Sequence, residues 1–509
     1  MIKKFIDKLL GKSAKAAPGP LGKRVEVPKR DHGIDPSLVD ERAVKVVTAL
    51  TEAGHEAYIV GGAVRDLLVG LRPKDFDVAT NATPEQVKAL FRRAFIIGRR
   101  FRIVHVVFGR GRQDRGRSEV IEVSTFRALL DASAEQVAGN EKTSKSELAG
   151  KTSVVDAAGR VLRDNVWGPQ IEDAARRDFT VNAMYYDPVR EIVVDYHGGI
   201  QDAKKKLLRM IGDPAARYRE DPVRIIRVVR FAAKLGFEIE PKTRAPIKAM
   251  AALLDNVPQS RTFDEMIKLL QTGHALASIE ELRKQGLHRG VFPVLDVALD
   301  EAHRHDGREK FVQLALADTD RRVAEGKPVA PSFMLACMLW HDVLDGWQKL
   351  KESGEPSFPA LQQAIDAAFD ARIGDISGRG KLAADMREIW MMQPRFERRS
   401  GSGPFTLVEQ LRFRAGFDFL RLRADAAEID AELAEWWEDF SLVDATERAR
   451  LMEAARGREP SRRVAGAGGA AGISGGVGSE GSDPARKKRR RRRRPAGGGE
   501  GSPPAPHAA

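Results

Sequence analysis

Residues 58–66 read YIVGGAVRD and residues 74–78 read KDFDV, so a double-glycine turn lies shortly before two aspartates. The apolar run before the glycines and the apolar residues after them predict a strand that turns directly into a helix. Successive side chains on a strand alternate between its two faces, so Asp75 and Asp77 are predicted to project from the same side. Two carboxylates on one rigid edge can bind hard divalent cations such as Mg²⁺.

Gly61 and Gly62 supply the other half of such a site. Because they have no side chains, backbone N–H groups there can closely approach a phosphate group. A metal ion that is held by the two aspartates can bridge to the phosphates of a bound nucleotide. Each motif alone is also typical of simpler structure, a tight turn or a solvated strand end. Their order and spacing together favour nucleotidyl transfer.

The segment 61–87, GGAVRDLLVGLRPKDFDVATNATPEQV, closely resembles the head domain of the bacterial poly(A) polymerase and CCA-adding nucleotidyltransferase family, the class II nucleotidyltransferases. The resemblance is strong from Tyr58 to Phe237 and continues in four further motifs, at 97–102, 121–123, 176–183 and 220–224. It implies an α+β fold, with a small mixed-sheet nucleotidyltransferase head, then an elongated all-α neck, body and tail region and a disordered basic C-terminus. It also implies that Gly61, Gly62 and Arg65 hold the nucleotide triphosphate.

The segment 121–123, Ile-Glu-Val, alternates apolar and acidic residues as a half-buried strand does. Glu122 could complete a three-carboxylate metal site with Asp75 and Asp77. The resemblance implies the same, because family members carry a third carboxylate at this place. The alternative is a surface strand residue that pairs with Arg127.

The motif Arg-Arg-Asp at 176–178 precedes a helix-like run at 180–185. Arginine offers two parallel donors to phosphate, so these cations suit a triphosphate. Asp178 could instead be an ordinary helix N-cap. The resemblance implies that Arg177, Asp178 and Asn182 contact the nucleotide.

Residues 220–224 open a strongly helical stretch, in which Pro222 fits the first helical position and Asp221 fits the cap. Glu220 and Arg224 could simply form a salt bridge at helix spacing, which contributes roughly 0.3 kcal/mol. The resemblance implies instead that Asp221 and Arg224 select the incoming base.

Arg224, Arg227 and Arg230 recur at every third position and would give this helix one basic stripe. Such a stripe is usually a solvated face. Here it follows a base-reading motif directly. We therefore expect Arg227 to contact the nucleotide and Arg230 to contact the RNA primer.

The net charge of +13 is concentrated at the C-terminus, because 460–509 holds eleven Arg or Lys against three Asp or Glu. This segment is rich in Gly, Ala, Ser and Pro, so we expect it to be disordered. A flexible polycation binds phosphate backbones without reading sequence. RNA contacts are expected in its basic run, namely at Arg486, Lys487, Lys488, Arg489 and Arg490. The alternatives are a solubility tail, a nuclear-localisation signal or a segment that attracts anionic lipid.

The chain is long enough for several domains, and its composition shifts suggest five segments. They are a flexible lead (1–35), the catalytic head (36–200), a helical neck with the base-reading motif (201–260), an all-α RNA-binding body and tail (261–458) and the Arg-rich extension (459–509). Within the head we expect a first helix at 36–54, strands at 57–60, 75–79, 103–108, 120–124 and 192–195, and a mobile insertion at 131–163.

A single cysteine, Cys337, excludes an intramolecular disulfide and a multi-cysteine zinc site. It lies in an apolar run, so a buried thiol in a reducing compartment, the cytoplasm, is expected. No apolar run approaches the length of a membrane span, which argues against integral insertion. Residues 1–10 are amphipathic and leave room for peripheral contact with a membrane surface.

Five residues compose a rival metal site of the HD phosphohydrolase type, which some CCA-adding relatives carry: His303, His305, Asp306, His341 and Asp342. His341 and Asp342 lie in an apolar helical stretch, where they could simply bond to each other. We therefore expect no metal-dependent hydrolase here.

The resemblance implies template-independent transfer of AMP from ATP to RNA 3′ ends, with two Mg²⁺ ions, or Mn²⁺, held by Asp75 and Asp77. It leaves open whether Glu122 or Asp178 is the third essential carboxylate. The expected substrates are mRNA, small RNAs and decay intermediates. RNA chaperones or degradosome proteins are expected as partners only because the family resemblance implies them. A CCA-adding tRNA nucleotidyltransferase is the alternative activity. A non-catalytic RNA-binding protein is less favoured, because the glycines and carboxylates are all present.

Overall fold

The computed structural model describes residues 21–98, 102–108, 120–129, 135–137, 153–156, 161–164, 166–287, 290–295, 306–372 and 380–458. The expected Arg-rich extension, with Arg486 to Arg490, lies outside these residues. So does the amphipathic segment at 1–10.

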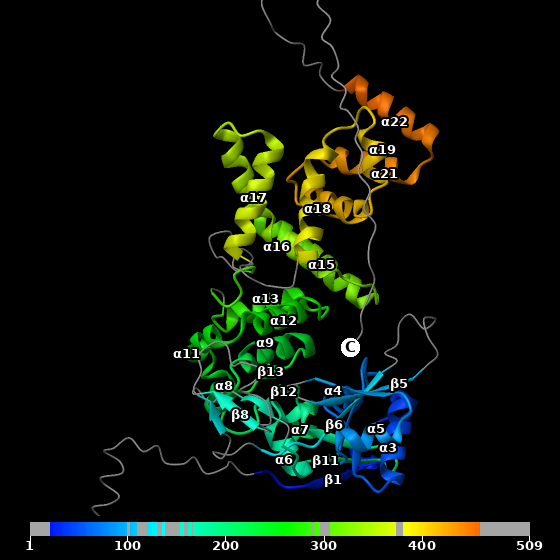
Figure 1. Ribbon diagram of the computed structural model, residues 1–509, viewed down its shortest axis with the longest axis vertical. Helices are drawn as coiled ribbons and strands as arrows, with labels where there is room; N and C mark the ends of the chain where they lie inside the picture. Colours follow the sequence, from blue (N-terminus) through cyan, green and yellow to red (C-terminus); the bar gives the residue numbers. More distant parts are fainter. Residues whose placement is uncertain are drawn as a thin grey trace, which may run out of the picture. The chain divides into compact units, whose positions relative to one another are not determined.

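The main sheet of the described residues has eight strands in the order β1-β11-β10-β2-β3-β6-β5-β4 (Figure 1). Neighbouring strands are antiparallel, except that β3 and β6 run parallel. The strands are β1 (Val25–Pro28), β2 (Ala57–Val60), β3 (Asp77–Thr80), β4 (Ala94–Ile97), β5 (Ile103–Val107), β6 (Val120–Thr125), β10 (Met184–Asp187) and β11 (Ile192–Asp195). The expected mixed-sheet head is confirmed.

Helix α3 (Glu41–Glu52) shows how the sequence produces the layer that covers this sheet. The Asp40 side chain accepts a hydrogen bond from the Arg42 N–H and so caps the helix. Buried residues recur at helical spacing along one face, at Ala43, Val46, Val47 and Leu50. The expected helix at 36–54 is therefore shorter, because a 3₁₀ turn (Pro36–Leu38) and the Asp40 cap come first.

The expected flexible lead at 1–35 is wrong in its last part. Strand β1 pairs with β11 at the edge of the sheet, and α2 (Lys29–His32) follows it directly. The short run Val25–Pro28 joins the sheet because backbone pairing, more than side-chain burial, holds an edge strand.

The expected insertion at 131–163 contains a separate three-stranded sheet in the order β7-β8-β9. Its strands are β7 (Glu135–Val137), β8 (Ser153–Asp156) and β9 (Val161–Asp164). The expectation of a mobile insertion did not include this sheet, because strands this short carry too few residues to show an alternating pattern.

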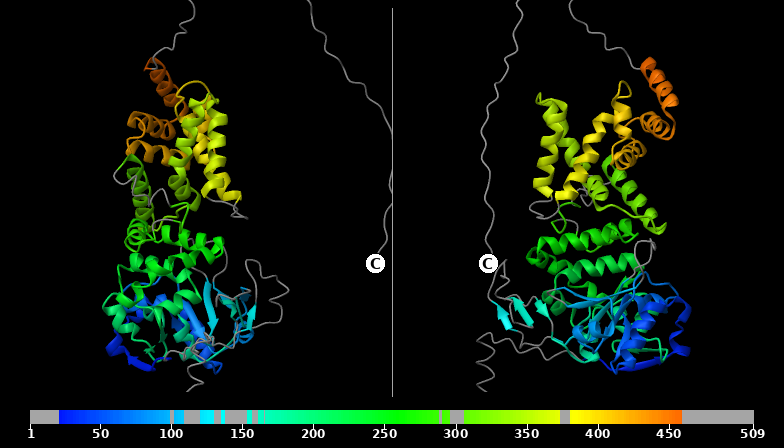
Figure 2. Two further views of the ribbon diagram at one scale, coloured as in Figure 1. Left: turned by 90° about the vertical axis from the view of Figure 1, so that its left-hand side faces the viewer. Right: turned by 45° about the vertical axis from the view of Figure 1, so that its right-hand side comes forward.

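Among the described residues from 199 onward, the chain is almost entirely helical, as expected (Figure 2). A small two-stranded ribbon is formed by β12 (Leu207–Leu208) and β13 (Glu238–Ile239), which are labelled in Figure 1. Helices α12 and α13 pack against α9, and α16 packs against α17 and α18. The helices that position the sites below are α8 (Pro214–Glu220), α9 (Val223–Leu235), α12 (Gln259–Leu270), α13 (Ala275–Lys284), α15 (Gly307–Ala324), α16 (Pro331–Glu352), α17 (Ser357–Arg372), α18 (Gly380–Phe396) and α20 (Phe413–Asp425).

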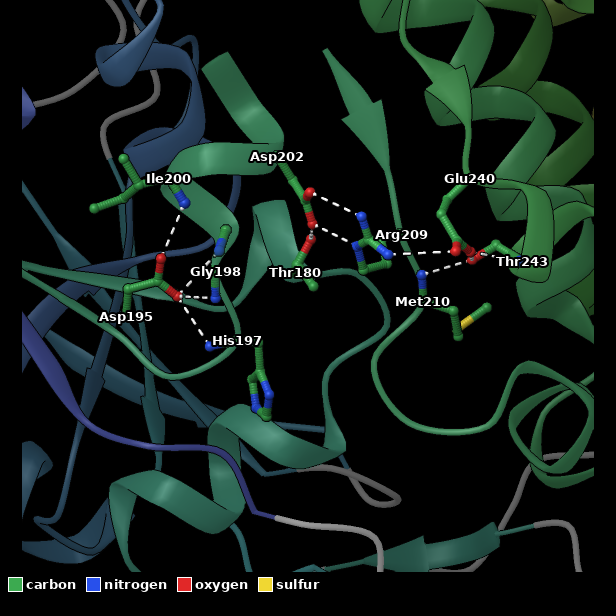
Figure 3. Close-up of polar contacts among 11 residues, drawn as sticks. Thr180, Asp195, His197, Gly198, Ile200, Asp202, Arg209, Met210, Glu240 and Thr243 are labelled. Carbon is green, nitrogen blue, oxygen red and sulfur yellow. Dashed lines mark hydrogen bonds and ion pairs between the residues drawn. The ribbon is translucent and has the colours of Figure 1, made fainter. Parts of the chain in front are cut away.

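A polar network connects the residues just before β10 with the helical part (Figure 3), and all of its side chains except that of Arg209 are buried. Arg209, just after β12, forms ion pairs with Asp202 of α7 (Gly199–Lys204) and with Glu240. Asp202 also accepts a hydrogen bond from Thr180, and Glu240 accepts one from Thr243. This network links the 3₁₀ turn Thr180–Asn182 and α7 to the residues that follow β13.

The rival phosphohydrolase site does not assemble in the described residues. His341 approaches Glu428 at 2.5 Å, Asp342 pairs with Arg372, and Asp306 caps α15. His303 and His305 lie outside the described residues. His341 and Asp342 thus pair with other residues and not with each other.

Cys337 is a free, fully buried thiol, as expected. Within the described ranges, no helix combines the length and the apolar character that a membrane crossing needs.

Candidate active site

The predicted carboxylates lie near the start of β3, a central strand of the sheet. Asp77 is the first residue of β3 and lies opposite Glu122 of β6 in the parallel register. Although Asp77 is accessible to solvent, partial desolvation by the surrounding protein raises its pKa to about 6, and repulsion from Glu122 and Asp75 adds to this rise. Three acidic groups thus share one location, and a cation there would relieve their repulsion.

Asp75 is not on the strand, which corrects the expected strand at 75–79. Strand β2 ends at Val60, opposite Asp77, because the chain turns at Gly61 into α4 (Gly62–Leu68). No β2 residue therefore remains to pair with Asp75, which is exposed just before β3.

The carboxylates offer only oxygen donors, the type that Mg²⁺ prefers. In the described ranges, no three His, Cys, Asp or Glu side chains already stand in a metal-binding arrangement. The donor chemistry therefore fits a divalent ion, whereas the ligand geometry is not preformed. The neighbour of Glu122 is His105, with Nε2 3.2 Å from Oε1, in place of the expected alternative, Arg127.

The double-glycine turn lies beside Arg177. Gly61 has a φ of +77°, a left-handed value that favours glycine, and its N–H donates to the Met184 carbonyl. A Cβ at Gly61 would lie 3.7 Å from Arg177 Nη1. Arg177 is anchored from the other side by Asp173, at 3.0 Å. Its positive charge opposes the pKa rise of Asp77, which places it near the carboxylates as well.

A hydrogen-bonded chain connects three of the predicted motifs. Arg65 Nη1 donates to Asn182 Oδ1 at 2.7 Å, and its other donors reach Asp66. Asn182 Nδ2 donates to Asp178 Oδ1 at 3.2 Å, and Arg227 Nε donates to Asp178 Oδ2 at 3.0 Å. Although burial favours the neutral acid, Arg227 holds the pKa of Asp178 at about 2. Asp178 is therefore a buried anion that orients its neighbours.

The expected helix-like run at 180–185 is wrong. Residues Thr180–Asn182 form a single 3₁₀ turn, and β10 begins at Met184. The turn allows Asn182 to reach both Arg65 and Asp178 before the chain enters the sheet.

A cleft of about 280 Å³ brings together five of the predicted nucleotide-binding residues, Arg177, Asp178, Asp221, Arg224 and Arg227. Val223, Arg261 and Glu265 complete its lining. The volume is close to the lower end of the range for small-molecule sites. Phosphate and base-edge recognition both need such convergent charged donors and acceptors.

Asp221 does not cap α9, contrary to the sequence expectation. Pro222 occupies the cap position, and the Asp221 carboxylate forms two hydrogen bonds with Arg261 of α12, at 3.1 and 3.2 Å. Arg261 and Glu265 were not predicted from the sequence. Their spacing of four residues on one helix would have placed them on the same face, but not against Asp221.

The expected basic stripe on α9 is a row of ion pairs. Arg224 pairs with Glu220 at 2.8 Å, the salt bridge that the sequence offered as the simpler interpretation. Arg230 is 11% exposed and pairs with Glu265 at 3.2 Å. Arg230 can reach RNA only if this ion pair opens, so its RNA contact stays a prediction.

Comparisons with known proteins match this chain with three family models. They are described as the poly A polymerase head domain (57–209), the probable RNA and SrmB-binding site of polymerase A (236–299) and the polymerase A arginine-rich C-terminus (353–495).

Full-length relatives agree with these models. Poly(A) polymerase I of Salmonella typhi is 40% identical over 84% of this chain and 88% of that protein. The protein of the same name from Escherichia coli O157:H7 is 40% identical over 86% and 90%. A CCA-adding enzyme from Bacillus licheniformis is 32% identical over 65% and 73%. A crystal structure of the Bacillus stearothermophilus CCA-adding enzyme with CTP shows 25% identity and a TM-score of 0.49, covering 81% of this chain and 82% of that one.

The mixed sheet with carboxylates at its central strands β3 and β6 and the matched head domain define a nucleotidyltransferase. Within this class, the poly(A) polymerase I relatives are more similar to the chain than the CCA-adding relative is. The chain belongs to the poly(A) polymerase I family.

Proposed function

We propose that this chain extends RNA 3′ ends by transferring AMP from ATP, with release of pyrophosphate. It is a polynucleotide adenylyltransferase, because poly(A) polymerase I relatives match most of its length and CCA-adding relatives are more distant. The observation that carries the site assignment is the cleft in which Arg177, Asp178, Asp221, Arg224 and Arg227 converge.

The triphosphate is assigned to the region between the glycine turn and Arg177. The open backbone at Gly61 and Gly62 leaves space for phosphate oxygens beside the guanidinium of Arg177. Arg65 is 3% exposed and already bonded to Asn182, so it acts mainly by holding this turn in shape.

The base is assigned to Asp221 and Arg224, which line the same cleft on and beside α9. A carboxylate and a guanidinium offer both acceptors and donors to a base edge. Arg227 connects this end of the cleft to Asp178. We propose a positioning role for Asp178, because its charge is fully used by Arg227, Asn182 and the Phe179 N–H.

Asp75 and Asp77 are proposed to hold two Mg²⁺ ions, with Glu122 as a further oxygen donor, and Mn²⁺ could take the same places. When bound, such ions neutralise phosphate charge and lower the pKa of the attacking hydroxyl. The residues of the chain then have the task of aligning the RNA 3′-hydroxyl with the α-phosphate.

We propose that the chain is divided into a head (36–200), a neck (201–260), an RNA-binding helical part (261–458) and a basic extension (459–509). RNA contact by Arg486 to Arg490 stays a prediction, as do a cytoplasmic location and RNA chaperone or degradosome partners. A chain that ends at 459 should bind RNA less tightly at low salt and with a shallower salt dependence. An unchanged salt slope would show that the extension does not contact RNA.

Position-specific labelling of ATP tests the reaction type. Label in the α-phosphate should enter the RNA, whereas label in the γ-phosphate should appear only in pyrophosphate. Transfer of the γ label to RNA would indicate phosphoryl transfer and would contradict the proposal.

A further inference from the structure

One row of residues crosses the sheet from the proposed metal site to the edge strand β4. Asp77 lies opposite Glu122 of β6. Glu122 in turn lies opposite His105 of β5, and His105 lies opposite Phe95 of β4. Residues that lie directly opposite each other on neighbouring strands project from the same face of a sheet. Strands are about 4.8 Å apart, so Phe95 lies about 10 Å from Glu122 along this row.

The face that carries this row is accessible over β4, β5 and β6. The alternate residues of these strands, such as Val104, Val106 and Val123, point the other way into a core cluster beneath α3 and α5 (Pro84–Leu90). On the face of the row, α6 (Gln170–Arg176) packs into a cluster with β2 and β10, and within the described ranges that cluster includes no residue of β4, β5 or β6. The side chains of these three strands on this face are therefore partly or fully exposed.

Phe95 gives this face an exposed aromatic ring. The residue is 58% exposed. A single exposed apolar residue needs no explanation by itself. Here, however, the ring shares a row with the carboxylates of the proposed metal site, and aromatic rings are the platforms on which unpaired RNA bases stack. Arg92 and Arg93, which are also exposed, come just before β4, so cations that can neutralise an RNA phosphate lie beside the ring.

His105 adds an unused polar group between Phe95 and the metal site. Its Nε2 lies 3.2 Å from Glu122 Oε1, but among the described residues this shielded nitrogen has no hydrogen-bond partner. A shielded nitrogen without a partner costs free energy, which a ligand can offset. The 2′-hydroxyl of RNA both donates and accepts, so it suits an imidazole nitrogen in either tautomer.

The direction of attack also places the RNA primer on this side. The triphosphate is proposed to lie at the glycine turn, which follows β2 and donates a hydrogen bond to Met184 of β10. In phosphoryl transfer, the attacking oxygen and the leaving group lie roughly in line on opposite sides of the phosphorus. In the sheet, β2 and β10 lie on one side of β3, whereas β6, β5 and β4 lie on the other. The RNA 3′-hydroxyl therefore approaches over β6, β5 and β4.

We propose that this face of β4, β5 and β6 binds the last two nucleotides of the RNA primer. One base stacks on Phe95, and the ribose of the terminal nucleotide bonds to His105 beside Glu122. The inference rests on the proposed function, because it takes RNA as the substrate.

Photo-crosslinking tests this placement. The full chain would be mixed, without ATP, with oligoadenylates that carry one 8-azidoadenosine, either at one of the two 3′-terminal positions or near the 5′ end. The terminal probes should label the peptide that contains β4, whereas the 5′ probe should not. No labelling of β4 by the terminal probes, or equal labelling by all probes, would overturn the proposal.

Substitutions at Phe95 test the stacking contact. Binding of a fluorescent oligoadenylate would be measured by anisotropy, again without ATP. Phe95→Leu keeps an apolar side chain but removes the ring, and it should weaken RNA binding about fivefold to tenfold, whereas Phe95→Tyr should retain the binding. The control Val189→Ala shortens an exposed apolar side chain in the turn between β10 and β11, and it should leave binding unchanged. RNA binding by Phe95→Leu that equals that of the control would overturn the proposal.

Kinetics and sedimentation separate RNA from other occupants of this face. Phe95→Leu should raise the KM for the RNA primer and leave the KM for ATP unchanged. A rise in the KM for ATP alone would assign the face to the nucleotide and overturn the proposal. So would a smaller assembly of Phe95→Leu without RNA together with unchanged RNA affinity, because the face would then bind a second copy of the chain. Crosslinking and binding are measured without catalysis, so a chain that binds RNA here but transfers no AMP would contradict the proposed function and not this inference.

Discussion

The buried ion pair between Asp178 and Arg227 makes a quantitative prediction. The Asp178 side chain is 10% exposed, and Arg227 donates to it through both Nε and Nη2. The substitution Asp178→Asn keeps the size of the side chain and one acceptor for the Phe179 N–H. It removes the negative charge that Arg227 faces.

The magnitude follows from the pKa of Asp178. A carboxyl group whose pKa falls from its ordinary value of 3.8 to about 2 contributes about 2.5 kcal/mol to the stability of the folded state. Because the folded pKa is lowered, this contribution is fully present above pH 4. It is lost as the pH falls from about 4 towards 2, where the folded protein also takes up the proton.

The assay is native-state hydrogen exchange of peptides that cover β10, because a multidomain chain does not unfold in one step. At pH 7 the variant should open with a free energy about 2.5 kcal/mol lower than the parent chain. The difference should shrink below pH 4. The control Asp31→Asn, at an exposed position in α2, should change little. Equal protection of Asp178→Asn and the parent chain at pH 7 would refute the reasoning.

Three further substitutions test separate parts of the site. Asp77→Ala should abolish AMP transfer while the circular-dichroism spectrum stays unchanged; retained turnover would remove Asp77 from the proposed metal site. Arg261→Met frees the Asp221 carboxylate and should raise the KM for ATP about threefold to tenfold, since the lost ion pair is partly exposed. An unchanged KM for ATP and an unchanged preference for ATP over CTP would show that Arg261 does not position Asp221. Gly61→Ala forces a side chain into a left-handed backbone and should cost about 1 kcal/mol and lower kcat/KM, whereas a fully active, equally stable variant would show that the turn is not constrained.

The sequence predicted the parts of the fold that local pattern determines. The strands at 57–60 and 192–195 have the expected bounds, because alternating or continuous apolar runs are bounded by turn residues. The helical part after residue 199 also followed from periodicity. The sequence did not reveal that Asp75 lies before its strand, since that depends on where the neighbouring strand ends at Val60.

The sequence motifs predicted many residues of the candidate site, but not the contacts that these residues make with residues far away in the sequence. Motifs that are close in sequence supplied Asp77, Asp178 and Asp221. The pairing of Asp221 with Arg261 joins residues forty positions apart on different helices, and no local pattern encodes such a contact. The same holds for the pair of Arg230 with Glu265, which places a side chain that was expected to contact RNA in an internal ion pair.

Single-nucleotide primer extension tests the central claim most directly. The purified chain with Mg²⁺ would be given each nucleotide alone, with an unstructured RNA and with a tRNA that lacks its terminal CCA. A long ladder on the unstructured RNA with ATP alone is the predicted result. Addition that stops after three residues on the tRNA and needs CTP as well as ATP would contradict it, and so would the absence of extension on both RNAs.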